Sequence, residues 1–554
     1  MPVDFYGLSS DFSPLLNQIL YNRGVTDLAQ LELFLNTDKR LLNDPFLLPD
    51  MPQAVNRIYR ALLSGEKIAV YGDFDADGIT ATAVMVKGLT SLGGQVIVYI
   101  PHRVSEGHGL KTAALDKLYQ QGVSLVITVD CGITALSEAK KAAKTGPDII
   151  ITDHHTPLEE LPRVIAVIDP KRKDSKYPFT DLAGVGVAFK LLQALYHSMG
   201  REEGMENLLD LVAIGTVADM MPLLGENRYL VIQGLKTLNT NLRPGLQELI
   251  NQARFREDNI SPEIISWLIA PRLNAAGRLE HALPGFHLLM AESADEAWEL
   301  ASWLEIKNIE RQKLTAKFLD KARQNVLSKE MAPLIYYSDS ECPIGILGLV
   351  AGRLTDEFYH PAIAVRVGKE TSTGSCRSIP EFNIISAITR CSSLLSQFGG
   401  HAQAAGFTLP ARNLNRFISN LSRIAEEELV GIELRPHLDI DAEVRFSELT
   451  GDTFRTIQKL APFGPGNPSP IFLSRGTKII GCQHIGNNGE HLKLKIKQGD
   501  TLWDAIAFRL GEPLSKVLHL PLDFVYNLEL NCWRGVETLR LNVLDFAPSD
   551  RNIN

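Results

Sequence analysis

The chain is 554 residues long, with 45% hydrophobic and 22% charged residues and a formal net charge of −9. This length exceeds what one hydrophobic core supports, and the composition is that of a globular protein, so a small single-domain protein and a disordered chain are both excluded. The acidic balance also argues against a protein that coats nucleic acid through an overall basic surface.

No targeting segment or membrane span is recognisable in the sequence. The first residues, MPVDFYGLSS, lack the basic start and apolar core of a signal peptide. No apolar run reaches the roughly 18 residues needed to cross a bilayer. The six cysteines show no C-x-x-C spacing, so neither a disulfide framework nor a zinc ribbon is indicated. We expect a cytoplasmic protein without membrane contact.

Along the first third of the chain, β-rich runs alternate with helical stretches. Residues 1–60 are expected to form a small helical cap. The β-rich runs that follow are KIAVYGD (67–73), QVIVYI (95–100), LVITVD (125–130), DIIITD (148–153) and VIAVID (164–169), with helices predicted near 79–92, 111–121 and 134–144. This alternation is typical of βαβ units and predicts an α/β fold with a mostly parallel sheet covered on both faces.

The remainder of the chain predicts a second α/β domain and a β-barrel. After helical stretches at 184–199 and 207–221, residues 292–328 show apolar positions at helical spacing without Gly or Pro, which predicts one long connecting helix. Strand patterns resume over 332–430. Beyond the Pro- and Gly-rich turn region at 461–470, runs such as HLKLKIK and ETLRLNVLDF alternate in hydrophobicity, and we expect an OB-like barrel there.

Three aspartates at alternate positions follow the first β-rich run, in YGDFDADGIT. If Asp73 is counted as the first position of an EF-hand calcium loop, then Asp75, Asp77 and Gly78 match that loop, but its twelfth position is Val84 instead of a bidentate Glu. The preceding segment also favours a strand over a helix. A solvated turn accounts for Gly78 and one aspartate, but not for three. Because carboxylates this close repel one another, we interpret the stretch as part of a metal site.

Acids and histidines also follow the later predicted strands. Asp130 ends the third strand, and Asp153, His154 and His155 follow the fourth. Ligands of open parallel sheets bind outside these carboxyl ends, although a single Asp there can simply cap a helix. Asp219, which follows an apolar helical run, is counted only as a member of this set.

This set of side chains predicts a centre with two divalent cations. A carboxylate-rich set with one or two imidazoles suits Mg²⁺ or Mn²⁺ better than zinc. More carboxylates than one ion can neutralise imply two ions, which at about 3.5–4 Å activate water and stabilise the oxygens at phosphorus. The predicted chemistry is hydrolysis of a phosphoester or phosphoanhydride.

Eight motifs in order carry a family resemblance that runs from about residue 45 to the carboxyl terminus. DFDADG, VDCG, TDHH and GTVAD resemble the four motifs of the DHH phosphoesterases, which are named for the Asp-His-His found here at 153–155. PRLNAAGRL, GSCRSIPEFNI, GGHAQAAGF and LAPFGPGNPSP resemble one branch of these, the RecJ-type exonucleases specific for single-stranded DNA.

The resemblance implies a 5′→3′ exonuclease of DNA recombination and repair that uses two Mn²⁺ or Mg²⁺ ions and releases 5′-mononucleotides. Together with the helical cap expected over 1–60, it implies a DHH catalytic domain (61–290), a connecting helix (291–330), a DHHA1-type substrate-binding domain (331–432) and an OB-fold-like nucleic-acid-binding domain (433–554). The family's metal ligands map onto Asp75, Asp77, Asp130, His154 and Asp219, with Asp130 expected to bridge the ions.

Further roles follow from the same resemblance. Other branches have a histidine where this chain has Tyr71, and Asp73 is expected to replace it as a ligand. His155 is expected either to contact the scissile phosphate or to hydrogen-bond to a ligand, and Asp153 is grouped with it and Asp130 as catalytic. In the 5′-end pocket, Arg103, Ser375 and Arg377 are expected to hold the terminal phosphate, because a guanidinium pairs two phosphate oxygens at once. The expected contacts to the backbone near the cleaved bond are Arg278, Gly399, Gly400 and His401.

Four departures from the branch pattern affect the substrate pocket and remove no expected metal ligand. Cys342-Pro343 stands where a Trp-His pair is usual, His108 where tyrosine is frequent, and Cys376 and Glu381 where glycine is usual. We assign no role to residues 342–343.

Three alternative functions share the DHH core. A family II inorganic pyrophosphatase and a nanoRNase or cyclic-dinucleotide phosphodiesterase are both shorter and lack the C-terminal β-domain. A Cdc45-like replication scaffold would have lost its acids, which are present here.

The expected partner is single-stranded DNA bound by a monomer, with a single-strand-binding protein or a helicase as a loading aid.

Overall fold

The computed structural model describes residues 13–36, 38–201, 203–255, 259–486, 489–533 and 536–549. The chain divides into two compact units. The two-sheet unit comprises Asn43–Met221 and Leu230–Pro436, and the barrel unit comprises the described parts of Met1–Leu42, Pro222–Tyr229 and His437–Asn554.

The first sheet of the two-sheet unit is entirely parallel, with the strand order β2-β1-β3-β4-β5. Its strands are β1 (Lys67–Tyr71), β2 (Gln95–Tyr99), β3 (Val123–Val129), β4 (Asp148–Thr152) and β5 (Ala166–Ile168). In this order the chain reverses direction across the sheet between β1 and β3, which is where open α/β sheets bind their ligands.

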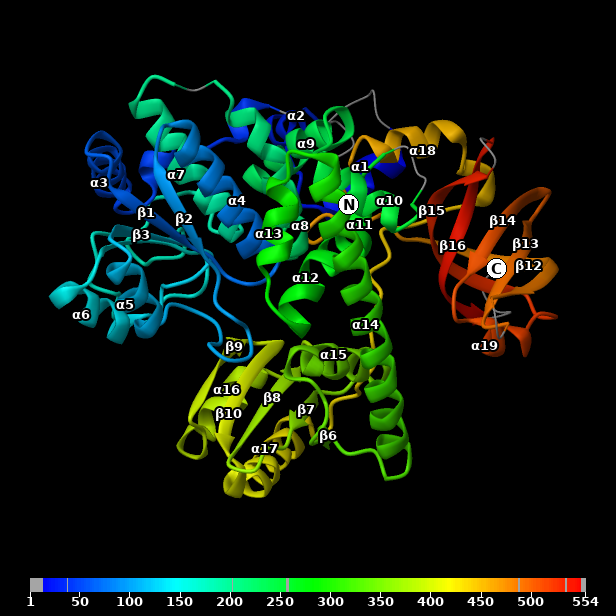
Figure 1. Cartoon of the computed structure of the whole chain (residues 1–554). Coiled ribbons are helices and arrows are strands. Elements are labelled where there is room, and N and C mark those ends of the chain that lie inside the picture. The colour runs from blue at the N-terminus through cyan, green and yellow to red at the C-terminus, as the bar shows by residue number, and fades with distance from the viewer. Residues whose placement is uncertain are drawn as a thin grey trace. The chain divides into compact units, whose positions relative to one another are not determined.

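Helices cover both faces of this sheet (Figure 1). They are α3 (Met51–Leu63), α4 (Ala76–Ser91), α5 (Thr112–Gln120), α6 (Leu136–Thr145) and α7 (Gly184–Ser198). Ala69 and Tyr71 of β1 pack with Leu115 and Leu118 of α5, and the alternate residue Val70 is equally buried. The near-continuous apolar runs of the strands therefore reflect burial on two faces.

A helical region and one long helix follow. The helices are α8 (Leu209–Ala218), α9 (Gly225–Thr240), α10 (Pro244–Gln252), α11 (Pro262–Ile264), α12 (Ala270–Leu279), α13 (Leu283–Met290) and α14 (Ala294–Leu327). The first half of α14 buries Ala297, Ala301 and Leu304, and its second half buries Phe318 and Ala322 against the second sheet's domain. The predicted connecting helix over 292–328 is therefore one continuous helix.

The second sheet has the order β6-β7-β8-β10-β9, and only β6 and β7 pair in parallel. Its strands are β6 (Ile335–Asp339), β7 (Ala362–Arg366), β8 (Thr371–Arg377), β9 (Gln397–His401) and β10 (Ala404–Pro410). The accompanying helices are α15 (Leu347–Phe358), α16 (Ile384–Arg390) and α17 (Leu414–Leu429).

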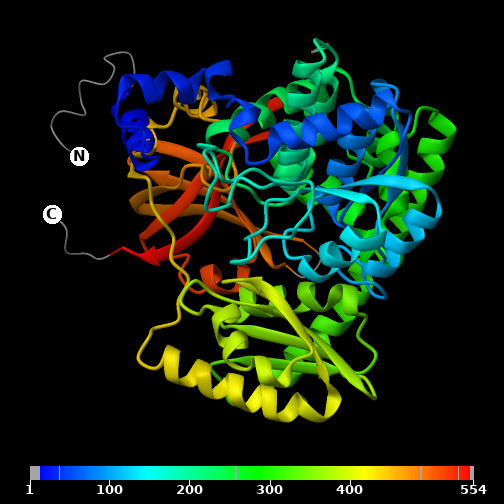
Figure 2. The same cartoon turned by 90° about the vertical axis from the view of Figure 1, so that its left-hand side faces the viewer.

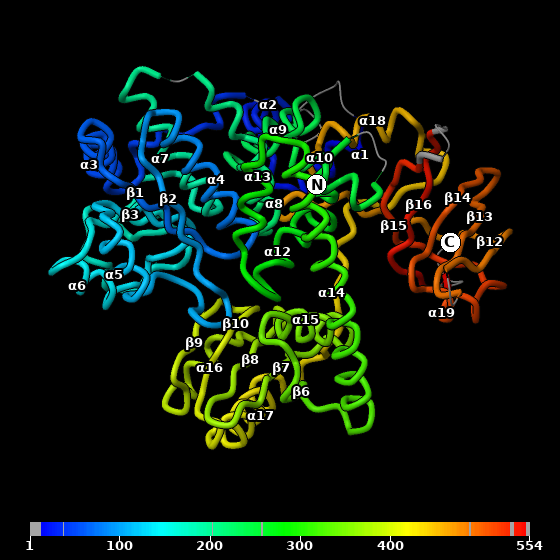
Figure 3. Tube along the Cα trace, viewed as in Figure 1, coloured from blue at the N-terminus to red at the C-terminus, as the bar shows by residue number. Residues whose placement is uncertain are grey.

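The barrel unit is closed by pairing between β12 and β15, in the order β12-β13-β14-β16-β15, with the short β11 at one edge. Its strands are β11 (Ala442–Glu443), β12 (Phe472–Ile485), β13 (His491–Gln498), β14 (Thr501–Ala507), β15 (Leu522–Trp533) and β16 (Val536–Pro548), whose path Figure 3 traces. Its helices are α1 (Pro14–Asn22), α2 (Leu28–Leu35), α18 (Gly451–Gln458) and α19 (Gly511–Ser515).

The amino-terminal helices belong to the core of the barrel unit. Leu16 and Leu20 of α1 lie in one buried cluster with Phe472 and Phe524 of the barrel, and Figure 2 shows the blue helices beside the orange and red strands. The predicted mostly parallel sheet, long helix, second α/β domain and OB-like barrel are all confirmed. Within the described ranges, no helix has the length and apolarity needed to cross a membrane.

Candidate metal centre

The first acids of the centre come from the junction of β1 and α4. Asp75 is the N-cap of α4, and its carboxylate accepts a hydrogen bond of 3.0 Å from the Gly78 N–H. A Cβ at Gly78 would lie only 2.6 Å from the carbonyl oxygen of Asp73, so this glycine is required by close packing in a helix, and the EF-hand interpretation fails on geometry as well. Asp73 and Asp77 are both buried beside it.

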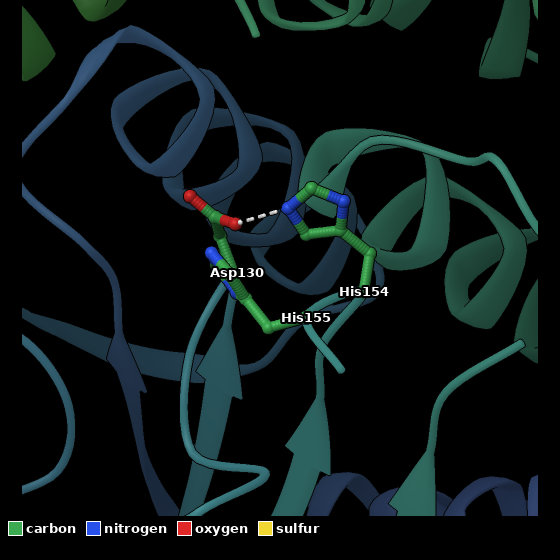
Figure 4. A group of neighbouring side chains, drawn as sticks. All are labelled: Asp130, His154 and His155. Carbon is green, nitrogen blue, oxygen red and sulfur yellow. Dashed lines mark ion pairs between the residues drawn. The ribbon is translucent and has the colours of Figure 1, made fainter. Parts of the chain in front are cut away.

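Asp130 enters from the end of β3 in an unusual backbone conformation. Its φ is +61°, in the left-handed region that few residues other than glycine adopt, although aspartate is among the more tolerant. Its side chain is buried and faces the ring of His154, whose Nε2 lies 3.1 Å from Asp130 Oδ1 (Figure 4). Backbone strain of this kind is concentrated at functional sites.

His154 lies at the middle of the acids. Its Nε2 is 3.6 Å from Asp219 Oδ2 and 3.9 Å from Asp77 Oδ2. Burial, followed by the charge of His155, lowers the pKa of His154 to about 3. The imidazole is therefore neutral at physiological pH, which is the form that ligates a metal ion.

Asp153 is used differently from the other acids. Its Oδ2 accepts the Ile133 N–H at 2.9 Å, and its Oδ1 accepts the N–H groups of His154 at 2.8 Å and His155 at 3.1 Å. The His155 Nδ1 lies 2.7 Å from the same Oδ1. Asp153 therefore organises the loop after β4. Its predicted catalytic role stays a prediction, and this geometry favours an indirect one.

Asp153 and His155 determine each other's charge. Burial would lower the pKa of His155, but the hydrogen bond and charge of Asp153 raise it to about 9. Burial would likewise raise the pKa of Asp153, but His155 holds it below its usual range. His155 is therefore an imidazolium at neutral pH, with Nδ1 turned to Asp153.

Three overlapping groups of side chains lie close enough to hold cations. Their ligand atoms all fall within 4.8 Å of one another in each group: Asp73, Asp75 and Asp130; Asp77, His154 and Asp219; and Asp130, His154 and His155. The structure thus brings together all the acids and histidines predicted as ligands from four separate segments. Asp130 and His154 each belong to two of the three groups, so these two residues link the whole set.

The electrostatics and the hydrogen bonding of these acids and histidines suit hard divalent cations. Burial, then the charges of neighbouring aspartates, raises the pKa of Asp77 and of Asp130 well above the usual range. Among the described residues, Asp73 Oδ1 and Asp130 Oδ1 are buried oxygens without a hydrogen-bond donor. Buried acids without donors are costly unless a cation compensates them, and oxygen-rich sets of this kind suit Mg²⁺ or Mn²⁺.

His108 is a neighbour of the centre whose position the sequence did not indicate. Its Nδ1 lies 3.2 Å from Asp73 Oδ2, and its ring meets that of His155 edge-on at 5.4 Å. The loop that carries it is held by Tyr71, whose hydroxyl donates to the Gly109 carbonyl at 3.1 Å. Tyr71, which replaces the histidine of other branches, thus fixes a loop that places another histidine beside Asp73.

Beside the acids, basic side chains gather without acidic partners. Arg278 is partly buried and its Nη1 donates to the Gly345 carbonyl at 3.0 Å, and Arg377 Nη1 lies 3.3 Å from Ser375 Oγ. Burial, then the charges of Arg103, Arg311 and Arg377, lowers the pKa of Arg278 to about 9. None of these four arginines forms an ion pair within the described residues. A cluster of this kind is a site for an anion.

Arg311 was not predicted as a member of this cluster. It lies on α14, which corresponds to the predicted connecting helix, and its Nε is buried without a partner among the described residues. Burial first, then the charges of Arg272 and Arg353, lowers its pKa. A single arginine on a charged helix gives no local sequence signal that its side chain is buried beside other arginines.

The segment carrying Gly399, Gly400 and His401 is strand β9, all of it exposed. The ring of His401 stacks parallel to that of His155, with centroids 6.2 Å apart. A Cβ at Gly399 would meet nothing within 4 Å, whereas Gly400 has a φ of +147° and packs against the backbone of Ala404. His401 is therefore brought to the centre, and the predicted contacts of the two glycines with substrate stay predictions.

Comparison with known proteins identifies the family. Three family models match the chain: the DHH family N-terminal domain over residues 67–216, the DHHA1 domain over 330–427 and the RecJ OB domain over 440–545. The single-stranded-DNA-specific exonuclease RecJ of Bacillus subtilis is 39% identical, over 97% of this chain and 68% of that protein. The RecJ of Haemophilus influenzae is 33% identical, over 98% of both chains. The chain belongs to the RecJ family.

Solved RecJ structures have the same fold. The structure of RecJ from Thermus thermophilus in complex with Mn²⁺ matches with a TM-score of 0.85 at 29% identity, covering 99% of this chain and 78% of that one. A structure of exonuclease RecJ bound to manganese matches with a TM-score of 0.61 at 33% identity, covering 71% of this chain and 98% of that one. The predicted family is confirmed, and the pyrophosphatase, phosphodiesterase and Cdc45-like alternatives are not favoured.

For this RecJ-family chain, cation binding is expected to release protons. Burial, then the charge of Asp75, raises the pKa of Asp219 to about 7, and the pKa values of Asp77 and Asp130 are raised as well. Protonated below their pKa, these acids must lose protons to ligate, so Mn²⁺ affinity should rise between about pH 6 and about pH 8. Calorimetric titration in buffers of different protonation enthalpy measures the release. An affinity independent of pH, with no proton release, would contradict the prediction.

Proposed function

We propose that this protein is a single-stranded-DNA-specific exonuclease that hydrolyses phosphodiester bonds from the 5′ end with two divalent cations, Mn²⁺ or Mg²⁺, and releases 5′-mononucleotides. The observation that carries the proposal is the position of the arginine cluster beside overlapping ligand groups that share Asp130. Such a site can hold a terminal phosphate and cut the next phosphodiester bond. The RecJ proteins that this chain resembles are named single-stranded-DNA-specific exonucleases.

Each side chain of the centre receives a role in this proposal. Asp73 and Asp75 would hold one cation and Asp77, His154 and Asp219 the other, with Asp130 between them. When bound, the two cations supply an activated water and stabilise the charge that develops at phosphorus. The His155 imidazolium, with Nδ1 on Asp153, would donate from Nε2 to an oxygen of the scissile phosphate.

Substrate binding is assigned to the cluster and to the barrel. The terminal 5′-phosphate would lie between Arg103, Arg311 and Arg377 beside Ser375. The DNA backbone near the cleaved bond would contact Arg278, Gly399, Gly400 and His401. On the barrel, Lys493 and Lys495 alternate with buried Leu494 on β13, so their ammonium groups face outward. They support nucleic-acid binding by this unit, as the OB fold does in many proteins.

The remaining parts of the proposal concern the cellular setting. We propose that the enzyme acts as a cytoplasmic monomer in DNA recombination and repair. Its net charge of −9 supports loading by a single-strand-binding protein or a helicase. The domain boundaries given from the sequence stay proposals.

Metal dependence and strand selectivity test the proposal together. Protein treated with a chelator and then supplied with Mn²⁺ should digest a single-stranded oligonucleotide and leave a blunt duplex of the same sequence largely intact. Without added cation both substrates should persist. Digestion of both substrates at equal rates, or digestion that survives the chelator, would contradict it.

A further inference from the structure

The amino end of α7 touches the metal centre although α7 supplies no ligand. The Gly184 N–H donates to Asp77 Oδ2 at 2.7 Å, and the Val185 N–H donates to Asp77 Oδ1 at 2.9 Å. Both oxygens of this buried carboxylate are thereby fixed, and each keeps a further lone pair for a cation. The partial positive charge at a helix amino terminus also favours the carboxylate there.

Gly184 also lies directly against Asp130. A Cβ built on Gly184 would lie 2.5 Å from both the Cβ and the Oδ1 of Asp130 and 2.6 Å from its Cγ. Such distances are far below van der Waals contact, so a side chain at 184 must displace either α7 or Asp130. Asp130 has little freedom to yield, because its backbone is already in the left-handed region.

The requirement at Gly184 is one of space and not of backbone conformation. Gly184 is the first residue of α7, and its helical backbone does not require a glycine. In the middle of a helix, glycine lowers stability by about 0.5–1 kcal/mol relative to alanine. Gly186 provides a comparison within the same helix. The nearest atoms to a Cβ there would be those of the Leu182 side chain, at 3.4 Å, which is ordinary van der Waals contact.

We propose that Gly184 is a positioning residue of the two-cation centre. Its missing side chain lets one helix terminus hold Asp77 while lying against Asp130, and so sets the separation of the two carboxylates. The inference rests on the proposed cation-dependent function and adds to it a residue that neither ligates a cation nor touches DNA. Because Mg²⁺ and Mn²⁺ tolerate little error in ligand position, a shift of either carboxylate weakens binding.

Titration of Mn²⁺ into the metal-free full-length protein tests this without DNA. Gly184→Ala should weaken Mn²⁺ binding by about 10- to 100-fold, the range found when groups that orient metal ligands are removed. Gly186→Ala, the same change two residues further along α7, should bind Mn²⁺ as the wild type does. Wild-type affinity in Gly184→Ala, or equal weakening in Gly186→Ala, would overturn the proposal.

A second measurement covers the case in which Gly184→Ala folds poorly. Asp130→Gly removes the side-chain atoms of residue 130 that the Cβ of Gly184→Ala would clash with. Glycine also adopts the positive φ of residue 130 without strain. In urea unfolding of the metal-free protein, Gly184→Ala should lower the midpoint in the wild-type background and change it little in the Asp130→Gly background. An equal loss in both backgrounds would overturn the proposal. Neither readout depends on nuclease activity. If the variants bind Mn²⁺ as described but the wild-type protein does not cut DNA, the proposed function is contradicted and the proposal for Gly184 is not.

Discussion

Asp75→Ala is expected to abolish the cation-dependent cleavage of single-stranded DNA, and His154→Ala is expected to do the same. Each removes one donor from a different ligand group of the centre. We expect a loss of at least about a thousandfold, which corresponds to about 4 kcal/mol of transition-state stabilisation. The measurement is the initial rate of mononucleotide release from a single strand at saturating Mn²⁺.

The fold should survive both changes. Asp75→Ala removes the N-cap of α4, which costs about 1 kcal/mol, but it also relieves repulsion among buried carboxylates. Asp75→Asn keeps the cap and should be equally inactive. Asp116→Ala is the matched control, because Asp116 lies on α5 in an exposed ion pair with Lys141. Cation-dependent cleavage retained by Asp75→Ala or His154→Ala would refute the assignment of the centre.

Arg377→Ala is expected to remove the preference for 5′-phosphorylated ends more than it slows the chemical step. The Arg377 guanidinium is partly buried near Arg278 and Arg103 and has no acidic partner among the described residues. Loss of a charge-assisted contact of about 1.5–3 kcal/mol corresponds to about a 10- to 100-fold rise in KM for the phosphorylated strand. Cleavage kinetics on strands with and without a 5′-phosphate measure it.

Arg366→Ala provides the control for general charge, because Arg366 is an exposed arginine at the end of β7 in the same domain. Its preference for phosphorylated ends should match that of the wild type. An equal loss on phosphorylated and unphosphorylated strands in Arg377→Ala would show that this arginine does not hold the terminal phosphate.

The parallel sheet and the acids at its strand ends could be predicted from the sequence, because both depend on local patterns. Continuous apolar runs alternate with helical stretches, and the residues that follow each run must lie at the same edge of a parallel sheet. That geometry alone brings Asp77, Asp130 and His154 together, although they are far apart in the chain.

The features that were missed depend on contacts between distant segments. His108 reaches Asp73 only because Tyr71 holds the intervening loop, and Arg311 turns a buried Nε away from solvent on a helix that otherwise looks like a charged spacer. The packing of α1 into the core of the barrel unit joins residues more than 400 positions apart. Periodicity along the chain contains no information about such pairings.

Gly78 and Gly184 show the same limit at single positions. From the sequence, Gly78 fits a turn as well as a metal-binding stretch, but the structure places it within α4, where its missing Cβ admits the backbone of Asp73. Gly184 attracted no interpretation, because a glycine in an apolar helix of the sequence GVGVAF looks like any other small core residue. Its hydrogen bond to Asp77 and its short distance to Asp130 distinguish it from Gly186, and both are contacts between distant segments.

The direction of digestion distinguishes the proposed 5′→3′ exonuclease from a nuclease that starts at the 3′ end. A single strand labelled at its 5′ end and the same strand labelled at its 3′ end are each incubated with the protein and Mn²⁺, and the products are followed over time. We expect labelled mononucleotide to appear at once from the 5′-labelled strand, while the 3′ label stays in progressively shorter fragments. Immediate release of mononucleotide from the 3′ label would contradict it.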